Sequence, residues 1–117
     1  MMYQKIAVGN TELEFCACAS VNVCYYNVFH EDFIKAISND GMEATTMMKM
    51  AFIMAKFAEL NDRKAVNRQT EDDYCNWLDQ FSIGDLIEAL PSIQEFYMGT
   101  ATGSASAKKN SAEPNVN

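Results

Sequence analysis

The side chains best suited to chemistry in this 117-residue chain are four cysteines and a single histidine. Cys16 and Cys18 are separated by one residue, which resembles half of a metal site, whereas structural zinc needs four ligands at recurring spacings. No second closely spaced pair accompanies them, and His30 is the only histidine. We therefore expect no metal site, and we interpret Cys16, Cys18, Cys24 and Cys75 as free, buried, apolar thiols.

The same residues do not indicate catalysis. A cysteine nucleophile needs a neighbouring base, and His30 is the only candidate. It lies beside Glu31 and Asp32 at an expected helix junction, which favours a surface or capping role. The sequence contains no nucleophile elbow, phosphate-binding loop, zinc-protease motif or dinucleotide fingerprint. We expect a protein that is not an enzyme and that binds no cofactor.

Charge and composition narrow the class of partner. The chain has sixteen acidic and nine basic residues, for a net charge of −7, and only two of the basic residues are arginines. This balance disfavours nucleic-acid phosphates and anionic membranes as partners. A hydrophobic content of 49% predicts one globular domain. Without a signal sequence or a membrane-spanning run, we expect a soluble, non-secreted protein.

The N-terminal residues predict a β-hairpin. Residues 3–8 and 11–19 flank a Gly9-Asn10 link, which is typical of a two-residue turn. Along the second run, apolar residues such as Leu13 and Phe15 alternate with acidic residues and cysteines. Two strands alone are marginally stable, so we expect the hairpin to pack on helices.

After residue 19 the pattern is helical. The expected helices cover residues 20–29 with Ser20 as cap, a short segment after Glu31 and Asp32 that ends at Asn39-Asp40-Gly41, residues 42–60, and a segment capped by Thr70. Two more are expected from capping-box spacings at Ser82–Asp85 and Ser92–Glu95, with Pro91 in the first turn of the second. Residues 61–69 look like a polar connection. The expected fold is α+β and mainly α-helical, with the hairpin packed on five or six helices.

The segment 42–60 holds five of the eight methionines, and its polar side chains are confined to one narrow stripe. The favoured interpretation is a central core helix. A second interpretation, which can coexist with the first, is a partner-binding surface, since methionine-rich surfaces adapt to their ligands. Met47, Met50, Met54 and Phe57 are the candidate residues of that surface.

Two further segments are distinguished by composition. Residues 69–98 contain seven acidic and no basic residues. A solvated acidic face is the default interpretation, and a docking face for a basic partner is the alternative. Residues 99–117 lack aromatic residues and have Val116 as their only large aliphatic residue. We therefore divide the chain into a folded domain, 1–98, and a flexible polar tail or linker, 99–117.

The order of these elements carries a family resemblance. It comprises the hairpin of residues 3–19, the aromatic run from Tyr25 to Phe33, and the helix containing Met54-Ala55-Lys56. Trp77 to Phe81 and then Asp85 to Ile93 complete it. In this layout, over residues 3–98, the chain resembles the tail assembly chaperones of long-tailed, non-contractile bacteriophages and prophages. That family often has a glycine where His30 stands here, so we expect a local change at this turn.

The resemblance implies a protein of the host bacterial cytoplasm that binds the tape measure protein, a very long, mostly helical and apolar chain. Such chaperones keep the tape measure protein soluble until the tail tube protein polymerises around it, and they are absent from the finished virion. Many relatives also form a longer product by −1 ribosomal frameshifting, whose extension recruits the tail tube protein. Lys108-Lys109 lies where such a slip would occur, and self-association is a further expectation.

Two other functions remain open from the sequence. The acidic stretch 69–98 motivates a DNA mimic that inhibits a nucleic-acid enzyme, although apolar faces separate its carboxylates. A structural tail-completion protein is the other alternative, and its presence in purified particles would distinguish it from a chaperone.

Overall fold

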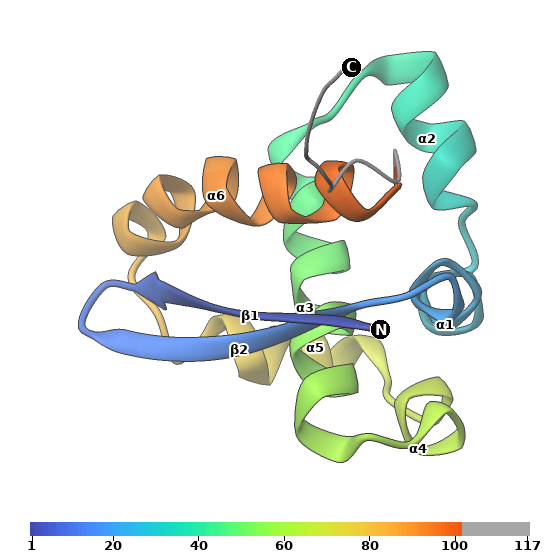
Figure 1. The fold of residues 1–117 in the computed structure, drawn as a ribbon, viewed down its shortest axis with the longest axis horizontal. Coiled ribbons are helices and arrows are strands. Elements are labelled where there is room, and N and C mark those ends of the chain that lie inside the picture. Colours follow the sequence, from blue (N-terminus) through green and yellow to red (C-terminus); the bar gives the residue numbers. More distant parts are fainter. Residues whose placement is uncertain (102–117) are drawn as a thin grey trace, which may run out of the picture.

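The computed structural model describes residues 1–101, which form an N-terminal hairpin packed among helices (Figure 1). The elements are β1 (Met2–Val8), β2 (Thr11–Ala17), α1 (Ser20–Phe29), α2 (Phe33–Asp40), α3 (Ala44–Leu60), α4 (Arg63–Asn67), α5 (Glu71–Leu78) and α6 (Ile83–Ala101). The predicted class, α+β and mainly helical with the hairpin on six helices, is confirmed for these residues. No helix among them is long and apolar enough to cross a membrane.

The hairpin is antiparallel and turns at Gly9-Asn10, as predicted. Ile6 pairs with Leu13, and Gln4 pairs with Phe15. Gly9 has a φ of 63°, in the left-handed region that favours glycine. A Cβ at Gly9 would also collide with the carboxylate of Asp85, so that side chain would have to move.

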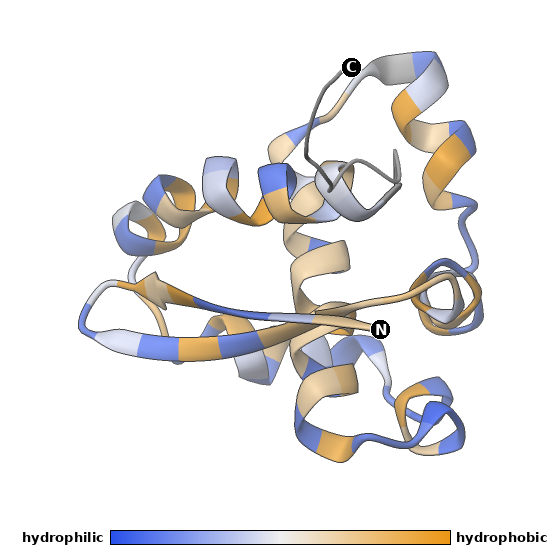
Figure 2. Cartoon of the chain, viewed as in Figure 1, coloured by the Kyte–Doolittle hydropathy of each residue, from blue (hydrophilic) through white to orange (hydrophobic). Residues whose placement is uncertain are grey.

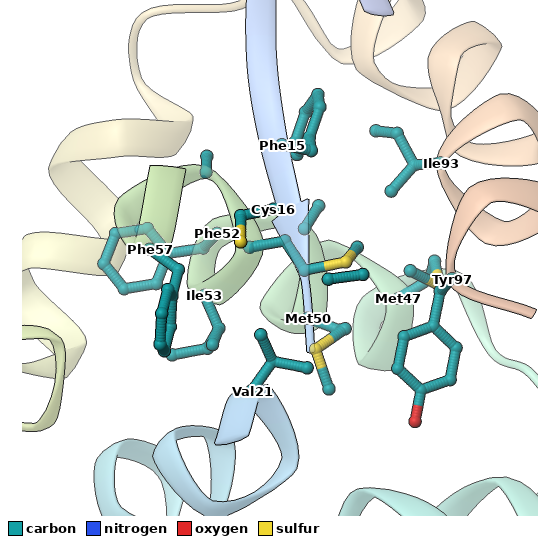
Figure 3. Packing of buried hydrophobic residues seen from close by; sticks show 14 of the residues in the cluster. Phe15, Cys16, Val21, Met47, Met50, Phe52, Ile53, Phe57, Ile93 and Tyr97 are labelled. Atoms are coloured by element: carbon teal, nitrogen blue, oxygen red, sulfur yellow. The ribbon is translucent and has the colours of Figure 1, made fainter. Parts of the chain in front are cut away.

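The end of β2 is buried on both faces, unlike the predicted alternation. Phe15 and Cys16 lie on opposite sides of the strand, and both are fully buried. Figure 3 shows Phe15 on the side of Ile93 from α6, and Cys16 on the side of Phe57 from α3. The hairpin therefore lies between two helices, which a pattern within one strand cannot reveal.

Helix α3 is the centre of the molecule, as the favoured interpretation predicted. The hairpin crosses it in Figure 1, with α6 above and α4 and α5 below in this view. Its buried residues occupy most of the circumference of the helix, apart from the stripe that holds Lys49 and Lys56; they are Thr46, Met47, Met50, Ala51, Phe52, Ile53, Met54, Ala55 and Phe57. The elements packed around α3 therefore remove its apolar surface from water. This burial stabilises the fold by about 25 cal/mol per Å² of apolar surface.

Aromatic rings link the elements around α3. Edge-on or tilted contacts, with ring centroids 5.0–6.3 Å apart, join the pairs Tyr25–Phe29, Tyr25–Phe33, Phe29–Phe52, Phe29–Tyr74, Phe33–Tyr97, Phe52–Tyr74, Phe52–Trp77 and Trp77–Phe81. These are the favourable geometries for aromatic pairs. The chain of rings connects α1, α2, α3, α5 and α6 into one rigid body.

The N-terminal signals predicted for α2 and α5 are confirmed, and the cap predicted for α1 is wrong. Asp32 caps α2 through its side chain, and Thr70 forms a capping box with Asp73 at α5. Ser20 is wrong as the cap of α1, because Ala19 precedes it at φ −57° and ψ −30°. The chain is already helical there, so no extended residue is available for a side-chain cap.

Helix α6 corrects the prediction of two helices. Asp85 N–H donates to Ser82 Oγ at 3.2 Å, but Pro91 lies inside a continuous helix and Ser92 caps nothing. Leu86, Ala89, Leu90, Ile93, Phe96 and Tyr97 are all buried. We infer that burial of this long apolar face outweighs the cost of an internal proline, which is about 3 kcal/mol.

The short helix α4 was not expected in the polar connection 61–69. Asp62 accepts a bond from Lys64 N–H at 3.0 Å, and Val66 is fully buried. One buried valine in a polar segment is too weak a signal for periodicity. At the other end, α6 continues to Ala101, three residues beyond the predicted domain boundary after Met98. The rest of the predicted tail, 102–117, lies outside the described residues.

Candidate functional site

The methionine-rich surface predicted from the sequence is not a surface. Met47, Met50, Met54 and Phe57 are at most 3% exposed, and Figure 3 shows Met47, Met50 and Phe57 within the core. The hairpin, α1 and α6 cover the faces of α3 on which they lie. These four residues therefore belong to the core, and binding to a partner must use other side chains.

Most of the exposed large apolar side chains fall into two groups. One comprises Met1, Met2, Val23, Tyr26 and Ile34, and the other comprises Ile83 and Ile87; Tyr3 and Met98 are also exposed. Figure 2 shows the hydrophobic residues of α1 and α2 at the right-hand edge of the molecule, away from the central helix. Exposed clusters of this kind mark candidate interaction sites.

The first region is hollowed. One hollow of about 470 Å³ lies between α1 and α2 and includes Val23, Tyr26 and Ile34. Another of about 500 Å³ includes Met1 and Met2. Both are lined by Asn22 and Ile34, so the two hollows lie next to each other. We call them together the N-terminal groove; its apolar rim consists of Met1, Met2, Val23, Tyr26 and Ile34.

The sequence of α1 explains why part of its surface stays apolar. The buried stripe of the helix contains Val21, Cys24, Tyr25 and Val28. Val23 and Tyr26 are one helical turn apart and lie outside that stripe, and both are more than half exposed. Apolar residues beside a complete core stripe are the signal from which the groove could have been predicted.

A hydrogen bond holds the floor of the groove in place. Tyr97 of α6 donates its O–H to Asn22 Oδ1 of α1 at 2.8 Å, and its ring meets Phe33 of α2 edge-on. Burial raises the pKa of Tyr97, so the phenol stays protonated and able to donate. Three helices are thereby fixed around the groove, which is largely preformed for a ligand.

The groove contains little charge. Asp32 and Lys35 supply its charged lining side chains. The Asp32 carboxylate already accepts a hydrogen bond from the backbone N–H of Lys35 at 2.9 Å. Such a surface suits an apolar ligand more than an ionic one. An amphipathic helix in a groove is the common way of binding such a ligand.

The side chains best suited to chemistry, the four cysteines, do not form a metal site among residues 1–101. All four cysteines are free, with Cys16 and Cys24 buried and Cys18 half-buried; Cys75 is exposed, contrary to the prediction of buried thiols. Burial raises the pKa of Cys24 to about 11, which disfavours the thiolate. Within residues 1–101, no group of three His, Cys, Asp or Glu side chains is placed to hold a metal ion.

His30 marks the turn between α1 and α2. It ends α1 with φ 57° and ψ 38°, and its N–H donates to the carbonyl of Tyr26. This left-handed conformation is the one that glycine adopts most easily at a helix end. His30 is thus a conformational feature of the turn.

Comparison of the chain with protein-family models, curated proteins and solved structures finds no match. Any function must therefore be argued from the chain's own geometry and from the resemblance of its sequence pattern.

Proposed function

We propose that this protein is a phage tail assembly chaperone that binds helical, apolar segments of the tape measure protein in the N-terminal groove. The observation that carries the proposal is the apolar rim of that groove, which α1, α2 and the N-terminal residues present to solvent above Tyr97 of α6. The order of motifs in the sequence, which resembles this chaperone family, supports the choice of partner. The setting is the host bacterial cytoplasm, and the chaperone is absent from the finished virion.

The size and flexibility of the rim suit such a task. Val23, Tyr26 and Ile34 are about half exposed, so covering each would contribute about 1 kcal/mol. Met1 and Met2 add flexible side chains that adapt to different sequences. After the entropic cost of association, each site binds weakly. Many copies along one long chain would nevertheless cover it, and each copy could be displaced when the tail tube forms.

The net charge of −7 contributes to solubility. Copies bound along one tape measure protein would repel those on the next, which keeps coated chains apart. In the same proposal, a longer product frameshifted near Lys108-Lys109 recruits the tail tube protein. These two lysines lie outside the described residues, and a gene without a slippery heptamer at their codons would contradict this part.

Co-expression with the tape measure protein of the same gene cluster tests the function. We expect the tape measure protein to be insoluble alone and to be soluble and copurify with the full-length chain. If it stays insoluble and no complex forms, the chaperone function is wrong. The DNA-mimic and tail-completion functions would then be tested by binding to a nucleic-acid enzyme and by analysis of purified particles.

Variants in the same assay test the groove separately. Tyr26→Ser with Ile34→Ser should abolish copurification, whereas Ile83→Ser with Ile87→Ser, a matched pair outside the groove, should not. All four side chains are 45% or more exposed, so we expect each variant to fold. Loss with the second pair alone would place the binding site elsewhere while leaving the function intact.

A further inference from the structure

We infer that a second surface, formed where α5 meets α6, docks a basic amphipathic helix of a partner protein. Ile83 and Ile87 are the exposed residues of this surface, and Met48, Leu78, Phe81 and Leu86 complete its apolar lining. A hollow of about 430 Å³ lies among them. We call these six residues the α5–α6 corner.

The core of the fold does not depend on the two exposed isoleucines. Ile83 is 84% exposed and Ile87 is 45% exposed, so Ile83 in particular adds little to the core. They are four residues apart on α6 and therefore lie on one face of the helix. Side chains at this spacing can pack beside the apolar stripe of a second helix.

The floor of the corner is rigid. Phe81 packs edge-on against Trp77 with ring centroids 5.1 Å apart, and Trp77 packs in the same way on Phe52 of the central helix. Trp77 is only 5% exposed. A fixed apolar floor reduces the ordering that a ligand must impose, so more of the contact energy remains for binding.

Charge selects the kind of partner. Asp79 lines the hollow, Glu88 follows Ile87 on α6, and the whole segment 69–98 contains no basic residue. The two lysines of the neighbouring α3 are paired elsewhere: Lys49 with Glu31 at 3.3 Å and Lys56 with Glu59 at 3.1 Å. An apolar patch with an acidic rim is complementary to a helix whose apolar stripe is flanked by Lys or Arg.

A second copy of this chain fits the corner poorly. Pairing two corners would bring two acidic surfaces together, and like charges across an interface are repulsive. A basic helix gains attraction from the same surface. The occupant is therefore a different, basic chain.

The corner is separate from the N-terminal groove. Tyr97 and Thr100 line the groove, whereas Ile83 and Ile87 line the corner. Both sets lie on α6, and Tyr97 comes fourteen residues after Ile83, a rise of about 21 Å at 1.5 Å per residue. The inference does not depend on what binds in the groove, and one chain can hold two different partners.

Isoleucine methyl NMR on the full-length protein tests this inference. The chain has seven isoleucines: Ile6, Ile34, Ile37, Ile53, Ile83, Ile87 and Ile93. The probes are three synthetic peptides of about 18 residues, long enough to form a helix on binding. One has a leucine stripe flanked by lysines, the second has glutamates in place of the lysines, and the third is the lysine peptide with its stripe scrambled.

We expect the lysine peptide to shift the methyl signals of Ile83 and Ile87 while that of Ile34 stays in place. It should bind roughly tenfold more tightly than either control peptide and more weakly at high salt. Ile83→Ser with Ile87→Ser should abolish binding, and Ile34→Ser should leave it unchanged. Trp77 fluorescence in thermal unfolding verifies that each variant is folded.

Three results would overturn the inference. Equal binding of the lysine and glutamate peptides would remove the charge argument, and equal binding of the scrambled peptide would show attraction to acidic surface alone. Shifts of Ile83 and Ile87 on raising the protein concentration without peptide would show a second copy as the occupant. Each can be distinguished from failure of the chaperone function, since that function is measured by co-expression with the tape measure protein.

Discussion

At the scale of single residues, two residues other than glycine adopt the left-handed backbone conformation that glycine prefers. His30 and Asn61 have φ values of 57° and 50°, each just after a helix. The left-handed conformation costs an ordinary L residue roughly 1–2 kcal/mol and costs asparagine less. The strain at His30 lies in the turn between α1 and α2, at a position that glycine would occupy without strain.

Replacing His30 by glycine should therefore stabilise the protein. We expect His30→Gly to raise the free energy of unfolding by about 0.5–1 kcal/mol, the strain relieved less the entropy that glycine adds to the unfolded chain. Asn61→Gly is the matched control and should change it less. Thermal unfolding followed by Trp77 fluorescence measures both, and a destabilised His30→Gly would show that the imidazole makes a needed contact.

Two glycines should respond in opposite ways to the same substitution. Gly9→Ala should destabilise by at least about 1–2 kcal/mol, because Gly9 has a positive φ and its added Cβ meets Asp85. Gly84→Ala should stabilise by up to about 1 kcal/mol, because it is helical and has open space around it. Urea unfolding of the pair measures both signs, and a neutral Gly9→Ala would contradict the structure of the turn.

Stability should fall at alkaline pH. Burial raises the pKa of the Cys24 thiol to about 11 and that of the Tyr74 phenol to about 12 in the folded protein. The unfolded chain releases these protons at lower pH, near 9 and 10. Folding therefore retains protons, and its stabilisation is full below pH 9 and is lost as the pH rises toward 11 and 12.

Tyr74→Phe isolates one part of that dependence. It keeps the ring contacts with Phe29 and Phe52 but has no proton to lose. Its melting temperature should fall less steeply above pH 10 than that of the wild type. Parallel curves for the two proteins would mean that Tyr74 ionises as easily in the folded state as in the unfolded chain.

At the scale of elements, sequence reasoning succeeds where the signal is local. Gly9-Asn10 predicts the hairpin turn, and Thr70 with Asp73 predicts the start of α5, because neighbouring residues alone satisfy these geometries. It fails where distant elements decide. Cys16 is buried because α3 covers the far side of β2, and α6 passes Pro91 unbroken because its apolar face packs along its length.

The candidate site shows the same difference between what local sequence signals predict and what distant elements decide. The stripe of α3 indicated a core helix correctly, but the sequence could not tell that hairpin and helices cover all sides of Met47, Met50 and Met54. Val23 and Tyr26 were overlooked because exposure depends on which face of α1 its neighbours leave open. Sequence periodicity identifies apolar faces, and only the packing of the elements decides which of them remain accessible.

A substitution at Ser92 tests whether residues 83–101 form one helix or two. As the cap of a separate helix it would contribute about 1 kcal/mol, whereas an exposed residue inside α6 contributes a few tenths. Ser92→Ala should therefore change stability little. Pro91→Ala should raise the free energy of unfolding by about 1–3 kcal/mol, since it restores a helical hydrogen bond. Loss of about 1 kcal/mol with Ser92→Ala would instead support the two-helix prediction.

At the scale of the whole molecule, α6 connects two apolar surfaces of different character. Its last turns border the N-terminal groove, which contains little charge, and its first turns form the acid-rimmed α5–α6 corner. The groove suits long apolar chains held weakly at many sites, and the corner suits one basic helix. In the proposed function, the acidic remainder of the surface would keep such assemblies soluble.

Photo-crosslinking in the co-expressed complex tests the central claim, that the tape measure protein lies in the N-terminal groove, most directly. A photoreactive residue replaces Tyr26 in one sample and Ile83 in another, and both positions are more than half exposed. We predict a crosslink to the tape measure protein from position 26 and none from position 83. A crosslink from position 83 alone, or from neither position in a complex that copurifies, would contradict the account.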